Sequence, residues 1–205
     1  MPAVAALPAL LLAAIVAGCA LGGRDHRSAV ATTGASDFRP ADIRQAVVLV
    51  RVVVGSTSRL SERDRKELPA LYESALLEAL DARAVVVRDV RAVDAPGASG
   101  ALAAAVARAR EVGVDHALVV NLRVDTDVVR VCEDTRRPLQ GQAGVWRQEA
   151  RVVRATDGGE RLRAAITTPD VEAECDGPRP TVQRRGMQAM TTAAVERLVA
   201  KIFAR

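Results

Sequence analysis

Few side chains in this sequence have the types and spacing that catalysis requires. The two histidines are His26 and His116, and His116 stands beside Asp115 at the start of an apolar run. A zinc site or a catalytic triad needs further partners that the spacing does not supply. Ser99, although flanked by glycines at 97 and 100, lacks the G-x-S-x-G spacing and preceding strand of a nucleophile elbow. We therefore expect no catalytic residue, with His116 in a turn or partly buried and Ser99 capping a helix.

An acidic segment resembles a calcium-binding loop in its first half only. Glu172, Glu174 and Asp176 alternate ahead of Gly177, but Gln183 stands where the bidentate acid should follow. We expect a solvated acidic loop, no bound metal and no cofactor.

The cysteine at position 19 has a specific context. Val16-Ala17-Gly18-Cys19 closes an uncharged, Ala/Leu-rich opening and resembles a bacterial lipobox. In that pattern the cysteine is lipidated and becomes the new N-terminus, so we expect a signal peptide over 1–18 and a lipid anchor on Cys19. An uncleaved transmembrane anchor or an ordinary secretory signal is the alternative, because the first residues lack the usual positive charge. The residue after the cysteine is Ala20 and not the Asp that resembles an inner-membrane retention signal. By that analogy we expect the periplasmic face of the outer membrane.

Composition limits what the rest of the chain can be. Removing residues 1–18 from the 205 leaves 187, enough for one domain with a core. That core must be aliphatic, because the chain holds only two Phe, one Tyr and one Trp. The formal net charge of +4 is modest, whereas nucleic-acid binding favours a concentrated basic face with aromatic side chains. We expect no nucleic-acid partner.

Hydrophobic patterning predicts a flexible tether over 19–41 and a single domain over 42–205. The segment 20–41 is polar and rich in Gly, Ser and Thr, so it buries too little surface to fold. Beyond it, β-branched runs predict strands and helical spacing predicts helices. The expected strands are 46–54, 84–90, 117–131, 145–155 and 160–168, and the expected helices follow Ser61, begin at Ser99, and cover 181–204.

The predicted fold is therefore α/β (α+β), in the order β-α-β-α-β-β-β-α, with three helices packed on a mixed five-stranded sheet. Because helical crossovers join the first three strands, we expect these strands to be parallel or nearly adjacent, and the last three to form an antiparallel meander around the turn at 156–159. The pattern slips phase near Asp125, which predicts a bulge or the edge of the core.

Lipidation of Cys19 would leave an even number of cysteines. The other two, Cys132 and Cys175, follow strands that end at the same side of the meander, and an oxidising compartment lets them pair. Closing a loop of about 44 residues stabilises a fold by roughly 4 kcal/mol. Two unrelated thiols are the alternative.

The meander also predicts a face rich in arginine. Even-numbered residues should face the core, namely Leu118, Leu122, Trp146, Val152, Leu162 and Ile166. If no bulge intervenes, the opposite face carries Arg123, Arg147, Arg151, Arg161 and Arg163. Guanidinium groups suit carboxylate and phosphate, so we expect this face to bind an anionic partner. The alternative is a solvated face balanced by Glu149 and Asp125.

Two turn motifs support a family resemblance. The run 109–120 moves from a helix end through Gly113-Val114-Asp115 into a strand, and 152–160 forms a hairpin around Thr156-Asp157-Gly158-Gly159. With the element order, they resemble a superfamily of bacterial envelope domains that includes the TolB amino-terminal domain, the lipoprotein activators of penicillin-binding proteins, and the curli-secretion lipoprotein CsgG. The resemblance covers about 43–204 and rests on turn chemistry.

The resemblance implies a non-catalytic, membrane-anchored lipoprotein that acts as an interaction or assembly module in the cell envelope. Its partner would be an envelope protein or a cell-wall component. The alternative is an oligomeric subunit of a secretion or envelope-assembly complex that self-associates through its sheet edge, and an enzyme ranks third.

Overall fold

The computed structural model describes residues 30–92, 98–133, 138–175 and 180–204. The predicted signal peptide, Cys19 and His26 lie outside these residues. Along the chain the elements are β1 (Val30–Gly34), the 3-10 turn η1 (Pro40–Asp42), β2 (Gln45–Val54), α1 (Glu62–Asp81), β3 (Val86–Ala92), α2 (Ala98–Val112), β4 (His116–Val131), β5 (Leu139–Arg154), β6 (Glu160–Pro169), β7 (Val171–Glu174), β8 (Thr181–Arg184) and α3 (Met187–Ile202).

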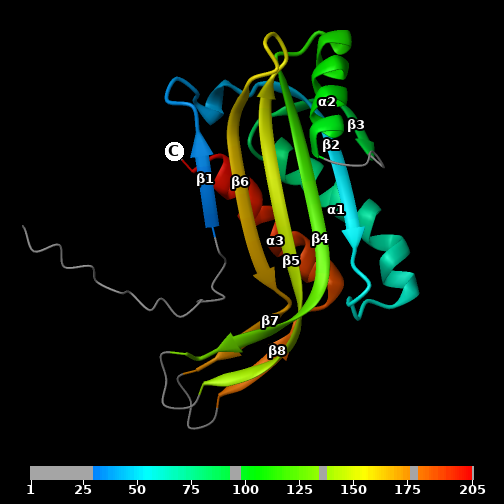
Figure 1. The fold of residues 1–205 in the computed structure, drawn as a ribbon, viewed down its shortest axis with the longest axis vertical. Coiled ribbons are helices and arrows are strands. Elements are labelled where there is room, and N and C mark those ends of the chain that lie inside the picture. Colours follow the sequence, from blue (N-terminus) through cyan, green and yellow to red (C-terminus); the bar gives the residue numbers. More distant parts are fainter. Residues whose placement is uncertain (1–29, 93–97, 134–137, 176–179, 205) are drawn as a thin grey trace, which may run out of the picture.

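One mixed sheet organises the body of the molecule, in the order β1-β6-β5-β4-β2-β3 (Figure 1). β2 pairs in parallel with both β3 and β4, and β4, β5 and β6 form an antiparallel meander. The predicted α/β class, the parallel strands, the meander and the three helices are confirmed. The sheet has six strands rather than the predicted five, and β7 and β8 form a separate two-stranded sheet.

The sixth strand comes from the predicted tether. β1 pairs antiparallel with β6, from Val30 opposite Ile166 to Gly34 opposite Leu162. The tether prediction over 19–41 is therefore wrong for residues 30–34, because the open edge of β6 offers hydrogen bonds that a short polar segment can complete. It is also wrong for Phe38 and Pro40, which are buried against the body.

The two faces of the sheet are covered unequally. α1 and α3 pack against one face over a continuous core, which they enter with Leu68, Tyr72 and Leu76 from α1 and Leu198 and Ile202 from α3. On the other face, α2 covers a smaller aliphatic cluster. Figure 1 views the molecule from the α2 side, with α1 and α3 behind the strands.

Local signals set the helix ends as expected in two cases. The Ser61 hydroxyl accepts the Asp64 N–H at 3.1 Å and caps α1. Gly113 follows α2 with φ +77°, the left-handed conformation of a C-terminal cap. α2 itself begins at Ala98, so Ser99 lies inside its first turn rather than at the predicted cap position.

An arm extends from the lower end of the body (Figure 1). The ends of β4 and β5 that lie beyond the body, together with β7 and β8, enclose a small cluster of Val129, Ala143 and Val145, against which Val171 packs. β4 and β5 remain in register from His116 opposite Arg154 to Val131 opposite Leu139. The predicted bulge near Asp125 is therefore absent from this ladder, and the phase slip marks the edge of the main core.

The C-terminal helix starts later than predicted. Thr181–Arg184 forms β8, paired with β7, and α3 begins only after Gly186.

Among the described residues no helix is long and apolar enough to cross a membrane.

Candidate functional site

The predicted inward set of the meander is confirmed. Leu118, Leu122, Trp146, Val152, Leu162 and Ile166 are all buried in the core under α1 and α3. Odd-numbered residues of β4 and β5, and of β6 from Arg163 to Thr167, therefore point to the face that carries α2.

α2 covers only part of that face. The aliphatic cluster beneath it includes Val47, Leu49, Val119 and Val153. These residues lie near the first residues of β2 and β4 and near the last residues of β5. Further toward the arm, no described helix packs on the strands, and a groove of about 390 Å³ runs across β2, β4, β5 and β6. We name this surface the open face; its groove is lined by Arg51, Val53, Asn121, Leu122, Arg123, Arg147, Gln148, Glu149, Ala165, Ile166 and Thr167.

Strand register arranges the open face in rows. One row runs Arg51, Asn121, Glu149 and Ala165 across the four strands. The side-chain carbonyl oxygen of Asn121 is buried there without a hydrogen-bond partner among the described residues. A polar group of this kind gains free energy if a ligand or water supplies the missing donor.

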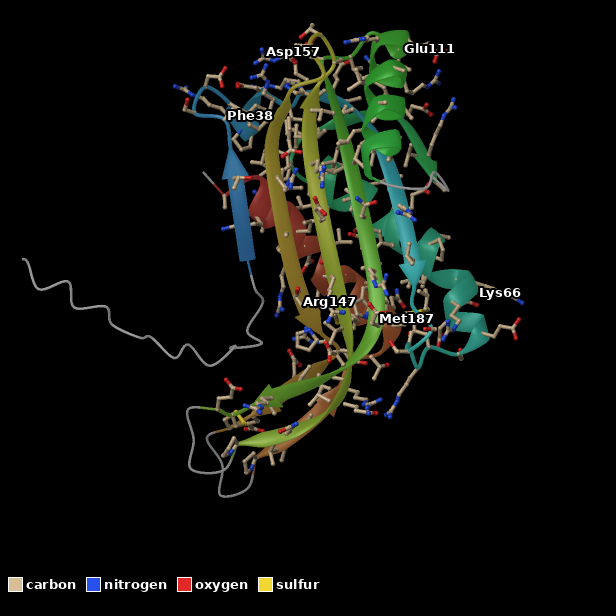
Figure 2. The ribbon with its side chains drawn as sticks, viewed as in Figure 1. Phe38, Lys66, Glu111, Arg147, Asp157 and Met187 are labelled. Atoms are coloured by element: carbon tan, nitrogen blue, oxygen red, sulfur yellow. A yellow bond between two sulfur atoms is a disulfide. The ribbon has the colours of Figure 1, made fainter. Side chains whose placement is uncertain are left out.

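Asp125 is the centre of one ion-pair cluster. Arg123 donates two hydrogen bonds to its carboxylate, at 2.6 and 3.2 Å, and Arg147 approaches at 3.3 Å. The hydrogen bond from Arg123 is the main cause that lowers the pKa of Asp125. The carboxylate lies against Gly55, where a Cβ would overlap it. Arg147 also donates to Asp127 at 2.6 Å, and Figure 2 shows Arg147 close to the base of the arm.

A second cluster lies closer to α2 on the same face. Arg151 donates to Glu149 at 2.6 Å, and Arg163 donates to Glu160 at 2.9 and 3.0 Å. Arg151 and Arg163 stand opposite each other on β5 and β6. The shared carboxylates offset the repulsion between the two cations.

Arg161 does not belong to this face. The β5–β6 register shifts between Val152 and Val153, so the condition of an unbroken ladder fails there. Arg161 instead pairs with Asp157 and lies 3.8 Å from Asp37, a carboxylate that Arg154 also approaches. The bulge breaks the parity on which the prediction relied.

The arginine face is thus nearly charge-balanced. Four of the five predicted arginines share it, and their ion pairs use Asp125, Asp127, Glu149 and Glu160. Arg51, which the meander-based reasoning missed because it lies on β2, forms no ion pair among the described residues and adds one positive charge. An anionic partner would therefore have to compete with the chain's own carboxylates, except at Arg51.

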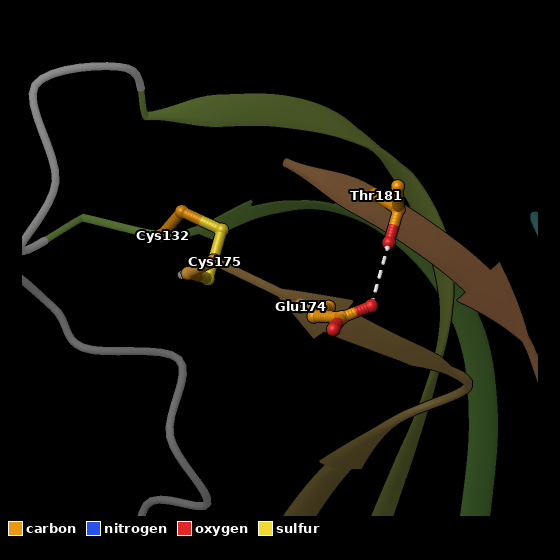
Figure 3. The surroundings of a disulfide bond; sticks show 4 residues. All are labelled: Cys132, Glu174, Cys175 and Thr181. Carbon is orange, nitrogen blue, oxygen red and sulfur yellow. Dashed lines mark hydrogen bonds between the residues drawn. A yellow bond between two sulfur atoms is a disulfide. The ribbon is translucent and has the colours of Figure 1, made fainter. Parts of the chain in front are cut away.

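The predicted disulfide between Cys132 and Cys175 is present, with the two Cα atoms 5.4 Å apart. It joins the end of β4 to the end of β7 in the arm (Figure 3), close to a 3.5 Å hydrogen bond from Thr181 to Glu174.

The other candidates for chemistry form no reactive constellation in the part of the chain that the structure describes. His116 is 8% exposed, and its ring centroid lies 5.9 Å from that of Phe38. Burial lowers the pKa of this imidazole. Glu172 pairs with Arg185. Among the described residues no group of three or more His, Cys, Asp or Glu side chains is placed to hold a metal ion.

No protein-family model and no curated protein sequence matches this chain. Among solved structures, it is similar to the PelC dodecamer from Paraburkholderia phytofirmans, at 15% identity and a TM-score of 0.44, over 87% of this chain and 99% of that one. It is also similar to a putative neuraminyllactose-binding hemagglutinin homolog from Helicobacter pylori, at 10% identity and a TM-score of 0.44, over 78% and 82% of the two chains. Likenesses of this strength assign neither a family nor a function.

Proposed function

We propose that this chain is a non-catalytic, membrane-tethered interaction module of the bacterial cell envelope, and that the open face contacts its partner. The observation that carries the proposal is the groove across four strands that α2 leaves uncovered. Sheet faces of this kind are normally covered by another layer. The groove also holds, in one row, the guanidinium of Arg51 and the side-chain carbonyl of Asn121, neither of which has a partner among the described residues.

The proposed location in the cell envelope rests on the cysteines and on the resemblance to envelope domains. Lipidation of Cys19 would attach the chain to a membrane, on the periplasmic face of the outer membrane in our proposal. The remaining two cysteines form a disulfide, which suits an oxidising compartment. Short turn motifs of the TolB, CsgG and penicillin-binding-protein-activator superfamily support the same placement.

The test is site-specific photocrosslinking in living cells. A photoreactive residue at Thr167, in the groove, should trap a discrete envelope partner or cell-wall fragment. The same residue at Ser74, on the exposed side of α1, serves as the matched control and should trap none. Equal capture from both positions, or none from Thr167, would contradict the proposal. Arg123→Gln, Arg151→Gln and Arg163→Gln together should weaken the crosslink, and an unchanged crosslink would contradict a contact through these arginines.

The tether is tested separately. Cys19→Ala should abolish fatty-acid labelling and release the chain from the membrane fraction. Retention of both would overturn the anchor without affecting the open face.

Self-association is the second candidate, and one feature favours it. β3 is an edge strand of the main sheet, and its Val86 side chain is 50% exposed. Unprotected edges of this kind pair readily with other strands. A ring of defined size in gel filtration with light scattering, lost on Val86→Lys, would favour an oligomeric assembly subunit over a monomeric module.

A further inference from the structure

A second pocket lies at the end of the body opposite the arm. Unlike the open face, it has arginines that are not balanced by carboxylates, and its bottom is apolar. It has a volume of about 620 Å³, within the usual range for small-molecule sites. Three separate parts of the chain build it: the segment 36–44 around η1, the turn after α1 at Arg83 and Ala84, and Phe203 at the end of α3. Figure 2 shows Phe38 in this region, far from Arg147 and the arm.

The floor of the pocket is apolar and firmly packed. Phe38 is 2% exposed and Ile43 is 6% exposed, and both belong to the main core. Buried Pro40 continues this surface, and the half-buried Phe203 adds a second aromatic ring. Such a floor favours an apolar group through the water that it releases.

Three arginines line the same pocket without acidic partners. Within the described residues, the side chains of Arg39, Arg44 and Arg83 form no ion pair, unlike the predicted arginines of the meander, and none of the lining residues is acidic. The Asp42 carboxylate accepts the backbone N–H of Arg39 at 3.2 Å. The guanidinium of Arg83 lies 5.9 Å from the centroid of Phe203, so the cation is held beside the apolar wall.

We propose that this pocket binds an amphipathic anion, meaning a phosphate or carboxylate group attached to a short apolar chain. The guanidinium groups would bind the anion through charge-assisted hydrogen bonds. The floor of Phe38, Pro40 and Ile43 would take the apolar part. The site is distinct from the open face, so it goes beyond the function proposed above.

Calorimetry on the full chain in phosphatidylcholine nanodiscs tests the proposal with three probes. Hexyl phosphate carries both required groups, whereas inorganic phosphate and hexanol each carry one. Hexyl phosphate should bind at least about tenfold more tightly than either partial probe. Undetectable binding of hexyl phosphate, or equal binding of inorganic phosphate, would overturn the proposal.

Matched variants locate the site. Arg44→Gln with Arg83→Gln should weaken hexyl phosphate binding about tenfold or more. Arg63→Gln with Arg197→Gln removes the same charge from exposed helical positions and should leave the affinity unchanged. Equal weakening in both pairs would overturn the site. Thermal unfolding checks that each variant folds, and the side chains concerned are exposed.

The source of the anion is distinguished by lipid composition. If membrane lipid is the natural ligand, nanodiscs containing phosphatidylglycerol should compete with hexyl phosphate for the native pocket. If the ligand is soluble, the affinity should be the same in both kinds of nanodisc. Either result supports the pocket, provided that the Arg44→Gln and Arg83→Gln pair weakens binding.

Discussion

Removal of the disulfide in the arm should lower the free energy of unfolding by up to about 4 kcal/mol. Cys132 and Cys175 are 43 positions apart, and a cross-link that closes a loop of this size restricts the unfolded chain by about that amount. In a domain of this size, 1 kcal/mol shifts the unfolding midpoint by about 2–4 °C. The expected decrease is therefore roughly 8–16 °C.

Removing the disulfide should destabilise the arm more than the body. The arm's own cluster consists of Val129, Ala143 and Val145 with Val171, which is a small apolar area for holding two ribbons together. Amide exchange should therefore accelerate more in β7 and β8 than in β2, which lies in the centre of the main sheet.

The comparison uses the full chain with Cys19→Ser, so that only one cysteine pair can oxidise. Urea and thermal unfolding of this chain are measured in oxidised and reduced forms, and again with Cys132→Ala and Cys175→Ala. Reduction and substitution should destabilise to a similar extent. Equal stability of the oxidised and reduced forms would refute the reasoning. A loss seen only on substitution would also refute it, because it would reflect packing rather than the cross-link.

Three further predictions concern the body. Gly55→Ala should lower the free energy of unfolding in urea by about 1–3 kcal/mol, because the new Cβ would overlap the Asp125 carboxylate. Gly100→Ala, in open space on α2, should instead raise it by about 0.5–1 kcal/mol. Equal effects of the two substitutions would contradict the overlap at Gly55. Tyr72→Phe should cost about 1–3 kcal/mol, because the buried Gln148 amide donates to this hydroxyl at 2.6 Å, and adding Gln148→Met should recover most of the loss. His116 has a pKa lowered by burial, so the unfolded state binds more protons below about pH 6.5 and acidification destabilises the fold; an unchanged slope of stability against pH between 7.5 and 5.5 in His116→Gln would contradict this.

The main sheet could be predicted because its strands carry strong local patterns. β2 is a dense β-branched run, and the alternation in β4 places Leu118 and Leu122 on the core side, as observed. Turn chemistry at Gly113 and at 156–159 fixed the ends of α2 and the β5–β6 hairpin.

The missed strands depend on partners distant in sequence. β1 is a five-residue segment in polar surroundings that becomes a strand only because β6 offers it an open edge. β7 and β8 have four residues each, and their pairing is favoured by the cluster that they help to enclose. Local propensity does not report such tertiary pairing.

The candidate sites were predicted only in part for the same reason. Parity placed Arg123, Arg147, Arg151 and Arg163 on one face, but a single bulge moved Arg161 away. Whether an arginine is paired depends on its cross-strand neighbours. The pocket at Arg83 is assembled from segments distant in sequence, so no local sequence pattern predicts it.

The continuous pairing of β4 with β5 has a mechanical consequence. Each strand has 16 residues, a length of roughly 50 Å, and the same two strands form the sheet interior at one end and the arm at the other. Bending the arm against the body would break ladder hydrogen bonds rather than turn a loop. The arm should therefore act as a stiff lever, so that a load applied at its tip is carried directly into the centre of the sheet.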